Sequence, residues 1–382
     1  MKKLIIFLAV FLFSNPLNII NSYRESVGLN RLKENPSLTL SAKWHSKYLF
    51  SNNEITHIQR RYGKNFSGET PAKRAIQSGY ASRFVVENIS AGEKSYNESI
   101  KDLFSAVYHR LGFLNFNIDE IGYYTLKNFY VYEMGNSLIN KACRYGENKK
   151  SGFAGLCENK NKIISADVYY RILKSNPHYV MWPYNGMKNT PAVFYEEMPD
   201  PLPGISVSGY PVSISFNPYY VKNVKVLGFS LFYGNKKVKT KFLNYKNDVN
   251  HMLKKTDFVL FPLERLEYGG KYLAVFNAVV DGKIKEYKWS FEVEEGKVPV
   301  IEVLGTKGRY NIKPNVTYLI YFRPLNVNDT VSHLKYEYKR GITVKKIGYK
   351  DANTVYLELS GKNGGKIHIK TKKRDIYLII KE

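Results

Sequence analysis

A cluster of prolines near the middle of the chain constrains its fold most. Pro199, Pro201 and Pro203 lie close together and are followed by Gly204. Proline lacks the amide hydrogen and the backbone freedom that helix interiors and central strands need. Residues 198–204 are therefore predicted to be an irregular linker. Helix signals precede it and strand signals follow it, which predicts separate domains of different class.

Helix signals recur through the first part of the chain. Asn35-Pro36 and Thr70-Pro71 each place an N-cap residue before a proline suited to the first helical position. Residues Ser95–Glu98 form a capping box. The apolar residues that follow it are spaced for one helix face: Ile100, Leu103, Phe104 and Val107. This pattern predicts a third helix that ends near His109.

Strand signals complete the first domain. Residues 121–124 and 129–134 are rich in aromatic and β-branched side chains, which favour strands. Helices and strands in one region predict an α+β domain over residues 15–197.

Short strands are expected from residue 205 onward. Residues 211–216 and 289–293 alternate apolar and polar side chains, and turn signals recur between them. Residues 205–295 are therefore predicted to form an Ig-like β-sandwich, one without the cysteines of an antibody core.

The last segment, residues 296–382, is predicted to be a small all-β module. Its expected strands are 318–322, 343–347, 355–359 and 376–380. From Lys297 to Glu382 the chain has 18 Lys and Arg against 7 Asp and Glu. A surface for anionic polymers of the cell envelope is one interpretation of this excess. The favoured one is a set of solvated lysines.

The net charge of the whole chain also favours anionic partners, but it does not identify one. Its 382 residues carry a formal net charge of +25, which predicts attraction to anionic polymers or surfaces. No nucleic-acid-binding motif accompanies the charge, so no specific nucleic-acid partner is expected.

The N-terminus is typical of an export signal. Lys2 and Lys3 precede an apolar run from Leu4 to Phe13, and residues 1–14 are predicted to be a signal peptide. An uncleaved anchor is the alternative. Ten apolar residues are too few to cross a bilayer, and no later window reaches the roughly 18 that a spanning helix needs. A secreted, surface or periplasmic location follows from this interpretation.

The cysteine count becomes informative once export is assumed. Cys143 and Cys157 are the two cysteines of the chain, and a Gly-, Asn- and Lys-rich stretch separates them. An oxidising compartment favours a disulfide between them, which would stabilise the fold by about 3 kcal/mol. Two free thiols are the alternative.

The first 200 residues resemble bacterial CAP domains, the superfamily of cysteine-rich secretory proteins, antigen 5 and pathogenesis-related 1 proteins, which are also called SCP-like. Several motifs occur in the family's order: Leu17–Arg24 with Gly28-Leu29, Asn35–His45, Glu54–His57, Thr70–Ala75 with Gly79-Tyr80, Glu87–Ile89, Tyr108–Arg110, Glu120–Tyr123, Pro191–Phe194 and Pro199–Pro203. The resemblance covers roughly residues 17–196. It implies an α-β-α sandwich.

The resemblance also implies a site. In it, His57, Glu87 and His109 would line a central cleft able to hold a small ligand or a divalent metal, Zn²⁺ or another, with His57 and His109 as the metal ligands. Zinc accepts nitrogen and oxygen ligands of this kind. Two positions depart from the family pattern. Ser105 stands in the helix that usually supplies a second glutamate, and Val86 stands where glycine usually precedes the motif glutamate. A hydrogen-bonded structural cluster of the same three residues is the alternative.

Three functions are compatible with these observations. The favoured one is a binding or interaction protein outside the cell, since family members are associated with sterol or lipid ligands and with metals. A metal-dependent hydrolase would use the same cleft, with Glu87 as general base and His57 and His109 on the metal. In the third, the CAP domain is a scaffold and the basic C-terminal module binds anionic glycan or lipid. Catalysis is the less favoured expectation.

Overall fold

A computed structural model describes residues 15–194, 197–205, 207–296, 298–325, 329, 331, 333–339, 341–351 and 353–381. The predicted signal peptide, residues 1–14, lies outside them. The described chain forms two compact units. The first holds residues up to Phe104, Tyr108–Val180 and Asn217–Tyr220, and the second holds Ser105–Val107, Met181–Phe216 and the chain from Val221 onward.

The first unit is built on a four-stranded sheet in the order β1-β3-β4-β2. Its strands are β1 (Lys33–Glu34), β2 (Val85–Ala91), β3 (Glu120–Leu126) and β4 (Phe129–Gly135). Its helices are α1 (Pro16–Ser26), α2 (Pro36–Asn52), α3 (Pro71–Gln77), α4 (Tyr96–Ser105), α5 (Val107–Phe113), α6 (Ser137–Tyr145) and α7 (Ala166–Lys174). Strands β2, β3 and β4 are antiparallel, whereas β1 joins β3 in parallel.

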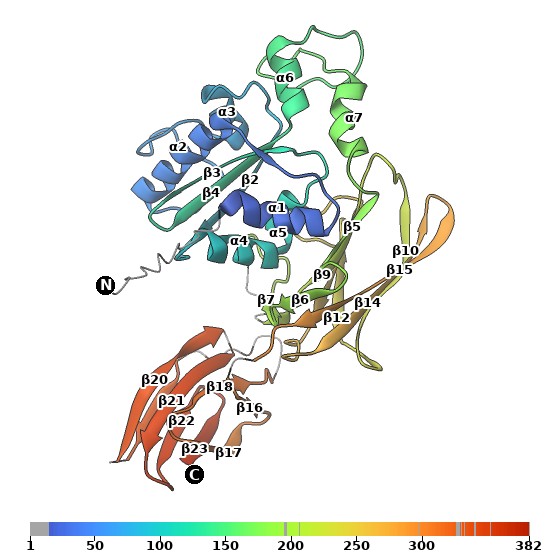
Figure 1. Cartoon of the computed structure of the whole chain (residues 1–382). Coiled ribbons are helices and arrows are strands. Elements are labelled where there is room, and N and C mark those ends of the chain that lie inside the picture. Colours follow the sequence, from blue (N-terminus) through green and yellow to red (C-terminus); the bar gives the residue numbers. More distant parts are fainter. Residues whose placement is uncertain are drawn as a thin grey trace, which may run out of the picture. The chain divides into compact units, whose positions relative to one another are not determined.

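Helices cover both faces of this sheet. Figure 1 shows α2 and α3 on one side of β2, β3 and β4, and α1, α4 and α5 on the other. Side chains of β4 alternate accordingly: Glu133 accepts a hydrogen bond from Ser41 of α2, while Tyr132 bonds Ser99 of α4. The expected α-β-α sandwich is confirmed.

Local sequence signals set the helix starts. Asn35 accepts hydrogen bonds from two backbone amides of α2, and Thr70 accepts one from α3, each with proline at the first helical position. The capping box at Ser95–Glu98 begins α4 as predicted. The predicted third helix, however, is two helices, because α4 ends at Ser105 and α5 begins at Val107.

Helix α2 lies unusually close to the sheet. A Cβ atom on Gly122 of β3 would stand 2.0 Å from the backbone nitrogen of Thr39 and 2.1 Å from the carbonyl carbon of Leu38. Only glycine allows this approach. The close contact places the next turns of α2, with Ser41 and His45, directly over β4 and β2.

The predicted disulfide is present. Cys143 of α6 is bonded to Cys157, with 5.3 Å between their Cα atoms, which is an ordinary span for such a bridge. Cys157 also forms a β-bridge with Ser82. The disulfide therefore ties α6 to the segment that enters β2.

The second unit begins with a β-sandwich. Its five-stranded sheet has the order β11-β10-β14-β15-β6 and its four-stranded sheet the order β12-β13-β9-β5, with a small pair β7-β8 beside them. The strands are β5 (Tyr179–Trp182), β6 (Met187–Thr190), β7 (Val193–Phe194), β8 (Ser208–Gly209), β9 (Val212–Phe216), β10 (Val224–Tyr233), β11 (Lys236–Lys237), β12 (Thr240–Asn244), β13 (Asp257–Pro262), β14 (Lys271–Val280) and β15 (Lys283–Val293).

Phenylalanines from both sheets fill the space between them. The ring of Phe276 on β14 lies 6.0 Å from Phe216 on β9 and 5.3 Å from Phe258 on β13, centre to centre. These are the distances of packed aromatic pairs. The sandwich predicted from strand alternation is thus formed around an aromatic core.

The sandwich starts earlier in the chain than the predicted boundary. We expected the first domain to reach residue 197 and the sandwich to begin at 205. Instead, β6 pairs in parallel with β15, and β5 stands next to β9. These strands precede the proline segment, so prolines mark an irregular stretch inside the second unit rather than a domain boundary. In the described part of 198–204 no helix or strand occurs, as predicted.

The last module contains two four-stranded sheets, in the orders β16-β18-β21-β20 and β17-β23-β22-β19. Its strands are β16 (Val300–Val303), β17 (Lys307–Ile312), β18 (Thr317–Phe322), β19 (Lys335–Tyr338), β20 (Ile342–Asp351), β21 (Thr354–Gly361), β22 (Lys366–Lys370) and β23 (Asp375–Ile380). Buried aliphatic side chains of both sheets form one core. The four predicted strands are all present.

The helices of the described chain are too short or too polar to cross a membrane.

Candidate functional site

Two glutamates stand side by side at the centre of the first unit. Glu87 of β2 is the register partner of Glu133 of β4, so both side chains project from the same face of the sheet. That face lies under α2 and α3. The Glu87 side chain is 1% exposed and that of Glu133 is fully buried.

Arg74 of α3 supplies the positive charge for this pair of carboxyl groups. Its Nη2 donates to Glu87 Oε2 at 2.6 Å, and its Nε lies 3.8 Å from Glu133 Oε1. Its Nη1 donates to the backbone carbonyls of His57 and Gly68. Arg74 therefore neutralises Glu87 and also holds the ends of the loop between α2 and α3.

His57 lies on that loop and reaches Glu87 from outside. Its Nδ1 is 2.8 Å from Glu87 Oε1, and 47% of its side chain is exposed to solvent. Because a carboxylate can only accept, Nδ1 carries the hydrogen and donates to Glu87. The other ring nitrogen, Nε2, is then the one that can accept a ligand or a proton.

His45 is the third group near Glu87, and it is completely buried. Its Nε2 is 2.9 Å from the carbonyl of Thr56, and its Nδ1 accepts from Nε2 of Gln59 at 2.8 Å. These partners specify the neutral ring with its hydrogen on Nε2. Burial lowers the pKa of His45 to about 4. His45 is therefore a packed core histidine.

The pKa values of the two carboxyl groups are shifted in opposite directions. Burial by itself would raise the pKa of Glu87, but His45, Arg74 and the hydrogen bond from His57 favour the carboxylate and lower its pKa overall. Burial raises the pKa of Glu133 well above its usual value, and the neighbouring negative charge of Glu87 adds to the effect. The surroundings thus favour a carboxylate at Glu87, opposite the buried guanidinium of Arg74, and a protonated carboxyl group at Glu133.

His109 is connected to the same strand through its backbone. It lies on α5 and is half-buried. Asn88, the residue after Glu87, donates its side-chain amide to the carbonyl of His109 at 2.8 Å. Neighbouring positions of β2 therefore bond to helical layers on both faces of the sheet, Glu87 to α3 and Asn88 to α5.

The fit of the expected site to a metal is partial. Across the residues that the structure describes, no three His, Cys, Asp or Glu side chains form a group that could hold a metal ion. Both oxygens of Glu87 already accept hydrogen bonds, one from His57 and one from Arg74. Glu87 is therefore placed to orient the His57 ring rather than to bind a metal itself, as carboxylates commonly do for metal-binding histidines.

The same contacts bear on the hydrolase alternative. A general base must reach the water whose proton it takes, and its pKa should lie near the working pH. The Glu87 side chain is almost completely buried, its oxygens are engaged by Arg74 and His57, and its pKa is lowered. This geometry argues against Glu87 as that base.

Sequence reasoning missed Arg74 and Glu133 as parts of the site. Arg74 was noted only within a family motif, and Glu133 only within a predicted strand. One signal was available: Glu133 is a charged residue inside the apolar run of β4, in which every residue is buried. A carboxyl group in such a run needs a buried partner or a proton.

Comparisons with known proteins agree with the fold of this unit. Residues 17–133 match the family model described as CAP, the cysteine-rich secretory protein family. No curated protein matches the chain.

Among solved structures, an extracellular protein of Bacillus anthracis that contains an SCP domain is 20% identical, with 32% of this chain covered, 39% of that one and a TM-score of 0.30. An outer surface protein of Borrelia burgdorferi is 23% identical, with coverage of 31% and 88% and a TM-score of 0.28. Fibronectin(III)-like modules of Clostridium thermocellum CbhA are 12% identical, with coverage of 53% and 94% and a TM-score of 0.18. The chain spans about two fifths of the first of these. The match of residues 17–133 to the CAP family model confirms the resemblance found in the motifs: this part of the chain is a CAP domain.

Proposed function

We propose that this chain is an extracellular or cell-surface binding protein whose CAP domain holds its ligand at His57. The observation that carries the proposal is the 2.8 Å contact between the half-exposed His57 ring and the buried Glu87 carboxylate. The contact fixes the ring and its tautomer while Nε2 remains the nitrogen for a ligand. A binding role needs only an oriented ring nitrogen. A catalytic role would also need a general base, which Glu87 does not provide.

The proposed location rests on three features. The N-terminal segment has the pattern of an export signal, and the Cys143–Cys157 disulfide is typical of an oxidising compartment. The matching family model is that of secretory proteins. Release from the cell and retention at its surface are both compatible with them.

The ligand we propose is a divalent metal such as Zn²⁺, with Nε2 of His57 as the protein group that holds it. Imidazole nitrogen suits zinc, which needs no carboxylate from Glu87. A metal bound there would supply a Lewis acid and a positive charge for a further anionic ligand. Glu87 and Arg74 contribute by keeping the imidazole of His57 oriented.

Titration calorimetry of the full chain with Zn²⁺ tests this proposal. His57→Ala should weaken binding about tenfold or more, because it removes the nitrogen ligand. The matched control is His251→Asn, which removes an exposed imidazole from the second unit. Asparagine suits the positive φ of 53° at that position, and this variant should bind like the original protein.

Two results would contradict the proposal. One is a folded protein that does not bind Zn²⁺ at all, which would make the His57–Glu87 pair a structural contact. The other is equal loss of binding in His251→Asn, which would indicate scattered surface sites. Circular dichroism of each variant shows whether it is folded.

A further inference from the structure

The β-sandwich is open along one side. Strand β10 pairs with β14 over its whole length but with β11 only at Phe232 and Tyr233. Strand β12 is the end strand of the other sheet. Within the described residues, the two sheets are therefore not closed where the first part of β10 faces β12.

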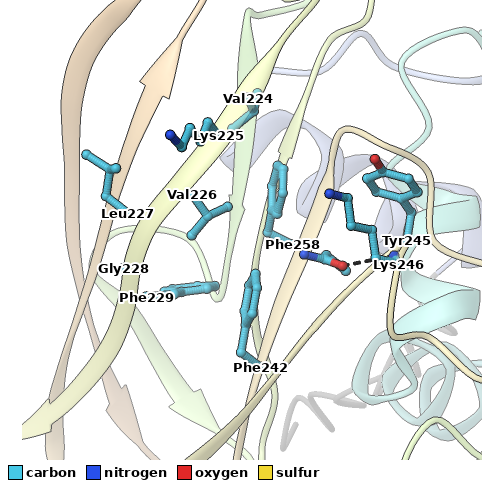
Figure 2. Close-up of a pocket in the computed structure, with 11 residues that line it drawn as sticks. Val224, Lys225, Val226, Leu227, Gly228, Phe229, Phe242, Tyr245, Lys246 and Phe258 are labelled. Atoms are coloured by element: carbon cyan, nitrogen blue, oxygen red, sulfur yellow. Dashed lines mark hydrogen bonds between the residues drawn. The ribbon is translucent and has the colours of Figure 1, made fainter.

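A pocket of about 540 Å³ lies at this opening, within the size range of ligand pockets. Figure 2 shows its residues, which come from β10, β12, β13 and the loop after β12.

The inner walls of the pocket are aromatic. Phe229 of β10 and Phe242 of β12 face each other across the sheets, with ring centres 6.3 Å apart, and Phe242 stacks with Phe258 of β13 at 6.5 Å. Phe229 and Phe242 are only half-buried, whereas Phe258 is 2% exposed. Apolar surface that is accessible within a sandwich core favours an apolar occupant.

An irregularity in β10 forms part of the opening. The register of β10 against β14 shifts between Val226 and Gly228, which leaves Leu227 as the extra residue of a bulge. Leu227 is 54% exposed. In Figure 2 Val226 and Phe229 point into the pocket, whereas Leu227 and Lys225 point away from it. The bulge thus keeps both Val226 and Phe229 on the inner face although they are three residues apart.

One cation stands at the mouth of the pocket. Lys246 follows β12, and Figure 2 shows its side chain extending toward the phenylalanines. Its Nζ lies 5.9 Å from the ring centre of Tyr245, and no carboxylate of the described chain forms an ion pair with it. Asn244 lies beside it, and its side-chain oxygen accepts from the Lys246 backbone amide at 2.9 Å. An apolar slot with one ammonium group at its mouth suits an amphiphile with an anionic head.

An added peptide strand suits the opening less well. Bulges and outward lysines are devices that protect an edge strand from pairing with another chain. Strand β10 has the bulge at Leu227 and the outward Lys225, and the edge strand β12 carries the exposed Lys241. These features oppose strand addition but do not obstruct entry of a flexible chain between the sheets.

We propose that this pocket binds a fatty-acid anion, with its acyl chain against Phe229, Phe242 and Phe258 and its carboxylate beside Lys246. The site lies in the β-sandwich and does not depend on the role of His57.

Equilibrium dialysis of the full chain with radiolabelled laurate tests the site. Val226→Trp, which fills the slot, should lower the affinity about tenfold or more, and Lys246→Glu should do the same by placing a carboxylate beside the head group. The matched control is Lys241→Glu, which makes the same charge change on β12 at a position that alternates to the opposite face. This variant should bind laurate like the original protein.

The comparison of laurate with dodecanol tests the head group. Laurate should bind at least several-fold more tightly to the original protein, and this preference should disappear in Lys246→Glu. Absence of laurate binding, equal binding by Val226→Trp, or equal losses in Lys246→Glu and Lys241→Glu would each overturn the proposal. Circular dichroism confirms that each variant is folded.

Discussion

The two units bury different chemistry between their layers. In the first, His45 of α2 and Arg74 of α3 pack against Glu87 and Glu133 of the sheet, and each of the four has specific partners. In the second, phenylalanines such as Phe276 fill the space between two sheets. A buried polar group requires its own partner, whereas an apolar core requires mainly volume. We therefore expect substitutions that change side-chain volume by similar amounts to change the free energy of unfolding by different amounts in the two units.

The largest expected effect comes from Glu87→Gln, which conserves volume but removes the charge opposite Arg74. An uncompensated buried guanidinium costs about 3–5 kcal/mol. The apolar counterpart is Leu260→Met in the core of the sandwich, a volume-conserving change expected to cost less than about 1.5 kcal/mol.

Urea unfolding of both variants, followed by circular dichroism, measures the two costs. Similar destabilisation by the two substitutions would show that the polar cluster is no more demanding than the aromatic core, and the contrast between the units would be lost.

A pH dependence is the next expected effect, and it should come from His45. Its pKa is about 4 in the folded chain against 6.5 for the free side chain. Between these values the unfolded chain binds more protons, so stability falls as the pH falls from about 6.5 to about 4. The full shift corresponds to about 3 kcal/mol. Glu87, Arg74 and His57 surround the ring and are common to the variants compared.

The measurement is the unfolding free energy of the original protein and of His45→Gln at several pH values in this window. The variant lacks the titrating ring, so its stability should fall less steeply. Parallel curves would mean that His45 titrates normally in the folded protein.

The smallest effect is expected for Glu133→Gln. Because burial raises its pKa, Glu133 keeps its proton in the folded chain to higher pH than in the unfolded chain, and the protonated carboxyl group resembles glutamine. The original protein therefore loses stability relative to the variant as the pH rises. At pH values above the ordinary pKa of glutamate the variant should therefore be more stable than the original protein, and its advantage should grow with pH for as long as Glu133 keeps its proton in the folded chain.

Unfolding midpoints in urea between pH 5.5 and 8 test this expectation against Glu87→Gln. A strong loss of stability in Glu133→Gln at every pH would show that Glu133 is ionised when folded. The two carboxyl groups would then not differ in charge.

Much of the fold was predictable because its signals are local. Asn35-Pro36, Thr70-Pro71 and the capping box at Ser95 fix where helices begin, because each bonds to amides a few residues away. Alternating and branched residues predicted the strands for a similar reason. The boundary before residue 198 was not predictable, because β5 and β6 are short and are defined by pairing with β9 and β15 much later in the chain.

The candidate site, too, was predictable from the sequence only in part. Motif order found His57, Glu87 and His109, and the contact between His57 and Glu87 is present. The role of Arg74 and the protonated state of Glu133 were not predictable, because they depend on residues that come together only when α3 and β4 meet β2. The pocket of the sandwich also escaped prediction, because Phe229, Phe242 and Phe258 line it only through the packing of two sheets.

The sequence alone determined the starts of α2, α3 and α4, several of the strands, the α+β class and the CAP motifs of the N-terminal domain, and it favoured the disulfide between the two cysteines. These depend on short-range hydrogen bonds, side-chain periodicity and composition. The tertiary structure decided which carboxyl group is charged, which histidine is buried, where the sandwich begins and where it stays open. Each of these depends on burial and on partners distant in sequence, and burial exists only after the layers have packed.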